Sequence, residues 1–159
     1  MILRWIQASL LIMICANLLS RTQSQYDRKK SVIIALAQLP KSLDPRLTTD
    51  ATGERMSALL FNSLVHLGPG LKVVGDAAER WEYKNKKYTF YLHKNLKFAD
   101  GSPLTKEDIL FTFAEYKKPT CPFKVSLDPV EKVEADFSGE QPTVTLTLKS
   151  FAAGLLVDL

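Results

Sequence analysis

The stretch LKFADGSPLTKEDILFTF, residues 96–113, decides how we interpret the rest of this 159-residue chain. Asp100, Gly101 and Pro103 predict a tight turn, because glycine adopts positive φ without strain and proline fixes the exit. Thr105 then has the position of a helix N-cap. Its hydroxyl can accept from the amide of Asp108, and the Asp108 carboxylate can accept from the amide of Thr105. The stretch therefore predicts a strand end, a tight turn and a capped helix.

The residues around the cap predict how this helix packs. Leu104 and Ile109 have the spacing of a hydrophobic staple, and acidic Glu107 in the first turn suits the helix dipole. Apolar side chains then recur on one helical face. That face is expected to consist of Ile109, Leu110, Phe113 and Ala114.

Composition places the chain among ordinary globular proteins. It is 46% hydrophobic and 24% charged, with a net charge of +4, which is compatible with one domain and one modest core. Part of the positive excess lies at residues 28–30, after an apolar segment, and at 84–87, in an expected hairpin turn. A nucleic-acid surface needs cations gathered on one face. The pattern therefore argues against nucleic acid as a partner.

Residues 1–24 predict a secretory signal peptide. The apolar run at 5–19 is too short and too interrupted for a membrane span of about 20 residues, and polar residues follow it. Cleavage is expected after Ser24 or Ser20, and an uncleaved N-terminal anchor is the alternative. A lipid anchor at Cys15 is not expected, because a bulky residue precedes it. The remaining cysteine, Cys121, is expected to lie in a loop without a disulfide partner.

Two segments before residue 70 predict a strand and a helix. The near-continuous apolar run at Ser31–Leu39 predicts a strand covered on both faces, which Pro40 ends. Apolar residues recur at three-and-four spacing across Gly53–Leu67, so we predict a helix there with Thr52 as its cap. The GPG sequence at 68–70 is expected to end that helix.

Two β-hairpins follow in the sequence. Apolar and polar residues alternate at 81–83 and 88–92, on either side of a polar loop, and again at 133–137 and 144–148. Such alternation predicts strands with one apolar face. The resulting fold class is α+β, with a mixed sheet, two hairpins and two main helices. One core is expected to include Phe61, Trp81, Phe90, Leu92, Ile109 and Phe113.

Three blocks of the sequence resemble a known family. The pattern FxDGxPLTxxD at 98–108, followed by FxF at 111–113, resembles the signature of the family 5 extracellular solute-binding proteins. The PxSLDP pattern at 40–45 is similar to the segment after that family's first strand. AxxxW at 77–81 and YTFxL at 88–92 resemble a third block. Family members are the peptide-binding components of ABC importers, so this resemblance implies a binding function.

The resemblance covers about residues 32–148 and implies part of one lobe of a two-lobed periplasmic binding protein. Such proteins trap ligand between their lobes by hinge closure. The implied partners are a peptide ligand and an inner-membrane ABC permease, and the implied location is the periplasm. In this family the first strand ends at the floor of the ligand cleft. The resemblance therefore implies Ala37, Gln38 and Leu39 as ligand-binding residues.

The resemblance also implies that the chain is truncated. Residues 25–159 would be the N-terminal part of the family's domain, without its second lobe. One cleft wall cannot bury most of a ligand's surface, so we expect this fragment to capture ligand poorly on its own.

A small secreted enzyme or an envelope scaffold protein is the alternative. The sequence has no GxSxG, no P-loop and no His/Cys set at metal-ligand spacing. Asp100 and Asp108 are accounted for by the turn and the cap. We therefore expect no catalytic residue, no metal and no cofactor. The ligand stays open among peptides, nickel complexes, haem and sugars.

Overall fold

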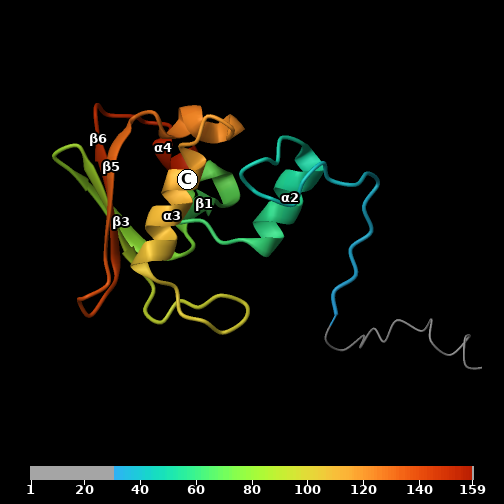
Figure 1. Ribbon diagram of the computed structural model, residues 1–159, viewed down its shortest axis with the longest axis horizontal. Helices are drawn as coiled ribbons and strands as arrows, with labels where there is room; N and C mark the ends of the chain where they lie inside the picture. The colour runs from blue at the N-terminus through green and yellow to red at the C-terminus, as the bar shows by residue number, and fades with distance from the viewer. Residues whose placement is uncertain (1–30, 159) are drawn as a thin grey trace, which may run out of the picture. The chain divides into compact units, whose positions relative to one another are not determined.

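The computed structural model describes residues 31–158, and the chain divides into two units, residues 1–36 and 37–159. The helices and strands that the structure describes between residues 31 and 158 all lie in the second unit (Figure 1). In chain order these are α2 (Ala51–Leu60), β1 (Val65–Leu67), the 3-10 helix η1 (Pro69–Leu71), β2 (Val73–Gly75), β3 (Ala78–Lys84), β4 (Lys87–Leu92), α3 (Lys106–Tyr116), the 3-10 helix η2 (Pro122–Leu127), β5 (Val130–Asp136), β6 (Thr143–Leu148) and α4 (Leu155–Asp158).

The main sheet has four strands in the order β3-β4-β6-β5, and β1 and β2 form a separate pair. The two predicted hairpins, β3-β4 and β5-β6, are confirmed, and they join through their inner strands with Phe90 opposite Val144. The α+β class is confirmed as well. Every pairing among residues 31–158 is antiparallel. The parallel part of the expected mixed sheet would have had to come from residues 31–39, which are not a strand.

The core lies on one face of the main sheet. Inward-facing side chains of β4 and β6 are buried there, and α3 packs beside β5. Of the six predicted core residues, Phe90 and Leu92 are fully buried, and Trp81, Ile109 and Phe113 pack against the core partly buried. Phe61 is 49% exposed, so its prediction was wrong. It follows the last residue of α2 and does not belong to this sheet's buried cluster.

The turn and capped helix are confirmed in detail. Gly101 has φ +87°, and Asp100 Oδ1 accepts from the amide and hydroxyl of Ser102 at 2.9 and 2.6 Å. The amide of Asp108 donates to Thr105 Oγ1 at 3.3 Å, and the amide of Thr105 donates to Asp108 Oδ2 at 2.9 Å. Both halves of the capping box are therefore made at the start of α3. The predicted apolar face of α3 is narrower than expected, because Ala114 is exposed.

The helix predicted at Gly53–Leu67 ends earlier and begins at a different cap. Asp50, not Thr52, is the N-cap of α2, with Oδ1 accepting from Gly53 N at 3.0 Å. The helix stops at Leu60, and Val65–Leu67 is strand β1. Asp76 fixes this change of conformation, since its carboxylate accepts from Ser63 N at 2.8 Å and from an Asn62 side chain. A contact with a residue 13 positions away thus overrides the local helical spacing.

The strand predicted at Ser31–Leu39 is also wrong. These residues form no strand, and none of the strands described at 31–158 pairs with them. An apolar run specifies burial, but a strand needs a neighbouring strand to take up its backbone N–H and C=O groups. The predicted signal peptide, residues 1–24, lies outside the described residues. Among residues 31–158 the helices are too short or too polar to span a membrane.

Candidate functional site

The segment from residue 40 to residue 50 is a loop closed on the start of α2. The amide of Lys41 donates to Asp50 Oδ2 at 3.1 Å, so the N-cap of α2 also holds the beginning of the loop. Thr48 is buried, and its hydroxyl lies 2.8 Å from Asp44 O and 3.3 Å from Ser42 O. These contacts give the loop a defined shape.

Arg46 fastens this loop to α3. Its Nε and Nη2 donate to the two carboxylate oxygens of Asp44 at 2.9 and 2.6 Å, and Nη1 forms an ion pair with Glu115 of α3. The hydrogen bond from Arg46 lowers the pKa of Asp44, and Lys118 together with Arg46 lowers the pKa of Glu115. We name this three-residue network, Asp44, Arg46 and Glu115, the arginine clamp. Planar guanidinium geometry suits such bidentate pairing better than lysine would.

Cys121 adds a second attachment between the loop and the helical side. Its thiol is buried, and Sγ lies 3.4 Å from the carbonyl oxygen of Arg46. The residue precedes η2, as expected for a loop cysteine. A buried thiol of this kind is a packing residue with a weak S–H donor.

The three predicted ligand residues lie just before the closed loop. Ala37, Gln38 and Leu39 are exposed, and Leu39 is 89% exposed. Their backbone groups make no hydrogen bond within residues 31–158. No hydrogen bond in that range joins them to the turn and cap at 100–108. The predicted ligand residues, 37–39, and the turn and cap at 100–108 are therefore separate features. Residues 37–39 are exposed and their backbone makes no hydrogen bond within residues 31–158, whereas residues 100–108 form a helix start held by its own hydrogen bonds.

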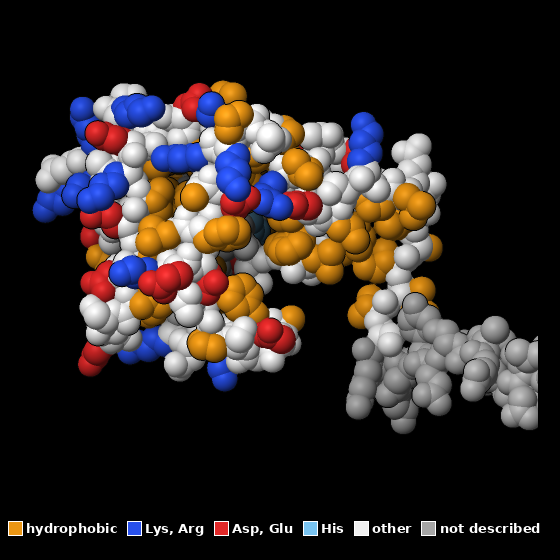
Figure 2. All heavy atoms as spheres, in the orientation of Figure 1, with side chains coloured by type: hydrophobic (Ala, Val, Ile, Leu, Met, Phe, Trp, Pro, Cys, Tyr) orange, Lys and Arg blue, Asp and Glu red, His pale blue; other side chains and the backbone are white. Residues whose placement is uncertain are grey.

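Exposed apolar side chains gather on α2 and on the loop before it. Leu59 of α2 is 66% exposed, and the neighbouring surface is of the same kind. Figure 2 shows the hydrophobic side chains gathered over α2 and the loop before it. The exposed members are Leu39, Leu43, Leu47, Leu59, Leu60 and Phe61. An exposed apolar patch that contains six large side chains marks a surface that another molecule, or another part of the same protein, covers.

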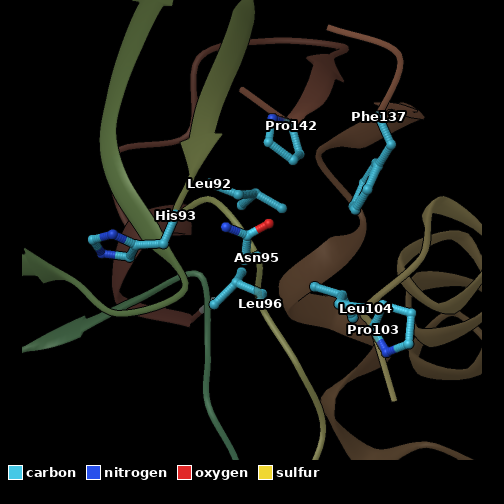
Figure 3. Close-up of a pocket in the computed structure, with 8 residues that line it drawn as sticks. All are labelled: Leu92, His93, Asn95, Leu96, Pro103, Leu104, Phe137 and Pro142. Atoms are coloured by element: carbon cyan, nitrogen blue, oxygen red, sulfur yellow. The ribbon is translucent and has the colours of Figure 1, made fainter. Parts of the chain in front are cut away.

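A small pocket lies elsewhere, between the end of β4, the turn before α3 and the β5-β6 turn (Figure 3). Its volume is about 200 Å³, and it is lined by Leu92, His93, Asn95, Leu96, Pro103, Leu104, Phe137 and Pro142. Most of these side chains are apolar, and in Figure 3 the His93 ring points away from the others. Ligand sites usually measure about 300–1,000 Å³. The pocket is therefore too small for a peptide, and nothing in the sequence pattern pointed to it.

The two acidic residues of the turn and cap, Asp100 and Asp108, serve as hydrogen-bond acceptors. Bonds from Ser102 lower the pKa of Asp100, and bonds from Thr105 lower the pKa of Asp108. Both carboxylates thus stay ionised as turn and cap acceptors, unlike a catalytic acid with a raised pKa. Within residues 31–158, no three His, Cys, Asp or Glu side chains are placed to hold a metal ion.

Comparisons with known proteins agree on one family. The model for the bacterial extracellular solute-binding proteins, family 5 (Middle), matches residues 72–155. The chain is 30% identical over 141 residues to the probable D,D-dipeptide-binding periplasmic protein DdpA of Escherichia coli, covering 82% of this chain and 26% of that protein. It is 31% identical over 98 residues to the periplasmic oligopeptide-binding protein OppA of Haemophilus influenzae, covering 60% of this chain and 18% of the relative.

Solved structures show the same fold. The binding protein AgaA of A. tumefacien R10, in complex with agropinic acid, has a TM-score of 0.65 at 25% identity, over 74% of this chain and 24% of AgaA. H. influenzae OppA in complex with the peptide RPPGFSPFR has a TM-score of 0.64 at 23% identity, over 74% of this chain and 26% of OppA. The chain thus spans about a quarter of the length of these relatives.

Proposed function

Since this chain belongs to the family 5 bacterial extracellular solute-binding proteins, we propose that it forms part of the substrate-binding component of an ABC-type importer for peptides. One observation carries the proposal. The matched residues, 72–155, contain the four-stranded sheet, α3 and their shared core as one packed unit. Relatives named for dipeptide and oligopeptide binding share this unit.

The proposed mechanism is capture without chemistry. The backbone N–H and C=O groups of residues 37–39 are exposed and unpaired within the described chain. An extended peptide can pair with such groups in the manner of an added strand. The closed loop and the arginine clamp keep the attachment point of this segment fixed against α3. A fixed attachment lowers the entropy that ordering a binding segment would cost.

Location and partners follow as part of the proposal. We assign residues 1–24 to a signal peptide and residues 25–159 to the N-terminal part of the family's domain, acting in the periplasm with an inner-membrane ABC permease. The relatives are periplasmic binding proteins by name. We also assign no catalytic role to the chain. A secreted enzyme is not favoured, since the family and the relatives are described as solute- and peptide-binding proteins.

Ligand affinity of the 159-residue chain alone is proposed to be low. The described pocket of about 200 Å³ is below the size of an ordinary ligand site. Residues 37–39 are largely open to solvent. A peptide lying on them would keep most of its surface in water, so it would gain little from burial.

A hybrid protein tests the proposal. In H. influenzae OppA, whose structure contains the peptide RPPGFSPFR, the segment matching residues 37–155 is replaced by those residues of this chain. Isothermal titration calorimetry then measures binding of that peptide and of a panel of di- to nonapeptides. We expect the hybrid to bind at least one peptide with micromolar affinity, and the 159-residue chain alone to bind none at that concentration. A hybrid with native-like circular dichroism that binds no peptide would contradict the proposed function.

Two substitutions at one position test the role of residues 37–39. Gln38→Pro removes the backbone N–H, whereas Gln38→Ala removes the side chain and keeps the N–H. Backbone pairing predicts that the hybrid with Gln38→Pro loses at least tenfold in affinity and that Gln38→Ala loses little. Equal affinities for both variants would refute the assignment of these residues and leave the family function untouched.

A further inference from the structure

Four lysines gather at one end of the main sheet. Lys84 and Lys87 lie directly opposite each other across the β3-β4 hairpin, and Lys86 occupies its turn. Lys149 follows β6 and is held beside the turn, since Lys86 Nζ donates to Lys149 O at 3.3 Å and Leu148 N donates to Lys86 O at 2.8 Å. We name Lys84, Lys86, Lys87 and Lys149 the lysine tip. Figure 2 shows blue side chains at this end, on the left.

The lysine tip carries most of its charge unpaired, although Lys132 of β5, together with Lys87, lowers the pKa of Glu134. All four side chains are exposed, and none takes part in an ion pair within residues 31–158. Lys132 of β5 lies in the same row of residues across the sheet, because both Lys87 and Lys132 are opposite Thr147. Its charge differs from those of the lysine tip because it forms an ion pair with Glu134 at 2.7 Å. Like charges directly opposite in a sheet are destabilising. The Lys84–Lys87 pair therefore does not stabilise the hairpin.

Two partly exposed aromatic rings lie at the same end of the sheet, on the face opposite Lys84 and Lys87. On that face Tyr83 also packs on the buried ring of Tyr88, at 4.7 Å between ring centroids. Tyr83 precedes Lys84 and is 40% exposed, and Phe151 follows Lys149 by two residues and is 62% exposed. Their ring centroids lie 5.4 Å apart, so the two strand ends present one aromatic pair. Elements that present aromatic rings on one face and lysines on the other are typical of surfaces that lie at the boundary between headgroups and acyl chains.

The kind of cation distinguishes a lipid surface from a protein surface. The lysine tip contains no arginine, although the described chain has arginines at 46, 55 and 80. Protein interfaces are enriched in arginine and depleted in lysine. Clusters of four or more lysines or arginines next to a membrane-spanning segment or on an amphipathic helix, by contrast, are typical of anionic-lipid binding. The composition therefore favours a headgroup surface over an acidic protein.

We propose that the lysine tip docks on an anionic phospholipid surface, with its four ammonium groups at the phosphates and with Tyr83 and Phe151 at the level of the glycerol backbone. Each lysine near such a surface contributes roughly fivefold to binding at ordinary ionic strength. Docking would bring the chain to the membrane by a surface separate from residues 37–39. The inference does not depend on which solute the family site takes.

Hydrogen exchange with mass spectrometry on the full chain tests this docking. Exchange is followed with vesicles of phosphatidylcholine alone and of phosphatidylcholine with about 30% phosphatidylglycerol, in 0.1 M salt. We expect amides at 83–87 and 149–151 to be protected only by the anionic vesicles, and the protection to disappear in 0.5 M sodium chloride. The apolar run at 5–19 would meet both kinds of vesicle, and the peptide-resolved readout separates it from the tip. Protection that is equal on both vesicles would overturn the proposal.

Matched charge variants complete the test. The triple variant Lys84→Gln, Lys86→Gln, Lys87→Gln should lower the binding that depends on phosphatidylglycerol at least tenfold. The control makes the same change in net charge at exposed lysines away from the tip, namely Lys72, Lys94 and Lys97. The control should bind as the parent chain does, with unchanged protection of β4 and β6 in both triples. An equal loss in the two triples, or protection of the tip by inorganic phosphate alone, would refute docking on a lipid surface.

Discussion

Gly75 is the position where one added methyl group should do the most damage. It ends β2, opposite Val65, which is 1% exposed. A Cβ atom built there lies 2.1 Å from the carbonyl oxygen of Ala78, a residue that is fully buried. The clashing atom belongs to the backbone, so no side-chain rotation can relieve it. Gly75→Ala must therefore move the corner between β2 and β3.

The expected loss of stability follows from the hydrogen bonds and packing at the corner between β2 and β3. Restoring ordinary van der Waals separation requires the strands to part by about 1 Å. The hydrogen bonds from Ala78 N to Leu64 O, at 3.0 Å, and from Ala77 N to Ser63 O, at 2.9 Å, cross this corner. Losing or stretching both costs about 1 kcal/mol each, and the overpacking itself about 1–3 kcal/mol. We expect Gly75→Ala to lower the free energy of unfolding by about 3–5 kcal/mol.

Urea denaturation followed by far-UV circular dichroism measures this loss. Gly139→Ala is the matched control, because the nearest atom to its Cβ would be Gln141 O at 3.9 Å and its φ is not positive. The control should change stability by no more than about 0.5 kcal/mol. If Gly75→Ala is as stable as Gly139→Ala, the close approach of β2 to Ala78 described here is incorrect.

Three further changes test other parts of the structure. Thr105→Ala should lower the free energy of unfolding by about 1 kcal/mol, because it removes the N-cap of α3. The control Thr112→Ala, on the exposed side of α3, should change the free energy of unfolding by less than about 0.5 kcal/mol. Equal losses in the two variants would contradict the capping box. The lowered pKa values of the two carboxylates paired with Arg46 contribute stability above pH about 4 that is lost as the pH falls through the folded-state pKa. Arg46→Gln should therefore be less stable than the parent at pH 7 and approach it at pH 3 in urea titrations, and a constant difference would argue against the clamp. In a Trp5→Phe background, Trp81 emission should lie to the blue of free tryptophan and move to the red in urea, since the ring packs against the core; a water-like spectrum in the folded chain would contradict that packing.

Short-range signals were enough to predict the hairpins and the start of α3. Alternation at period two depends only on neighbouring residues, and so does the bond between Thr105 and Asp108, three positions apart. The structure confirms both. Two of the three sequence blocks that carried the family resemblance lie in these stretches, and the family match at 72–155 covers both.

Long-range contacts decided the features that the sequence did not predict. α2 ends where Asp76 captures the amide of Ser63, and the spacing of Leu64 and Leu67 is equally compatible with a helix. Both Asp50 and Thr52 are good N-cap types, and Asp50 is selected because it also accepts from Lys41.

The candidate site also depends on contacts between residues that are far apart in the sequence, which local patterns do not predict. The arginine clamp joins residues 69 positions apart, and no local pattern links Arg46 to Glu115. From hydrophobicity alone, the exposed apolar side chains around α2 would be predicted to lie in the core. Their partners are not among residues 31–158, so hydrophobicity predicted burial where the structure shows exposure.

The way the two hairpins join bears on how fast the sheet assembles. Each hairpin closes over a turn of a few residues, whereas β4 meets β6 across everything between residues 92 and 143. Closing so long a loop is the slow, entropically costly event in folding. A helix that is already formed inside the loop shortens the chain that must be closed. The threonine at the start of α3 should therefore accelerate assembly of strands with which it shares no hydrogen bond.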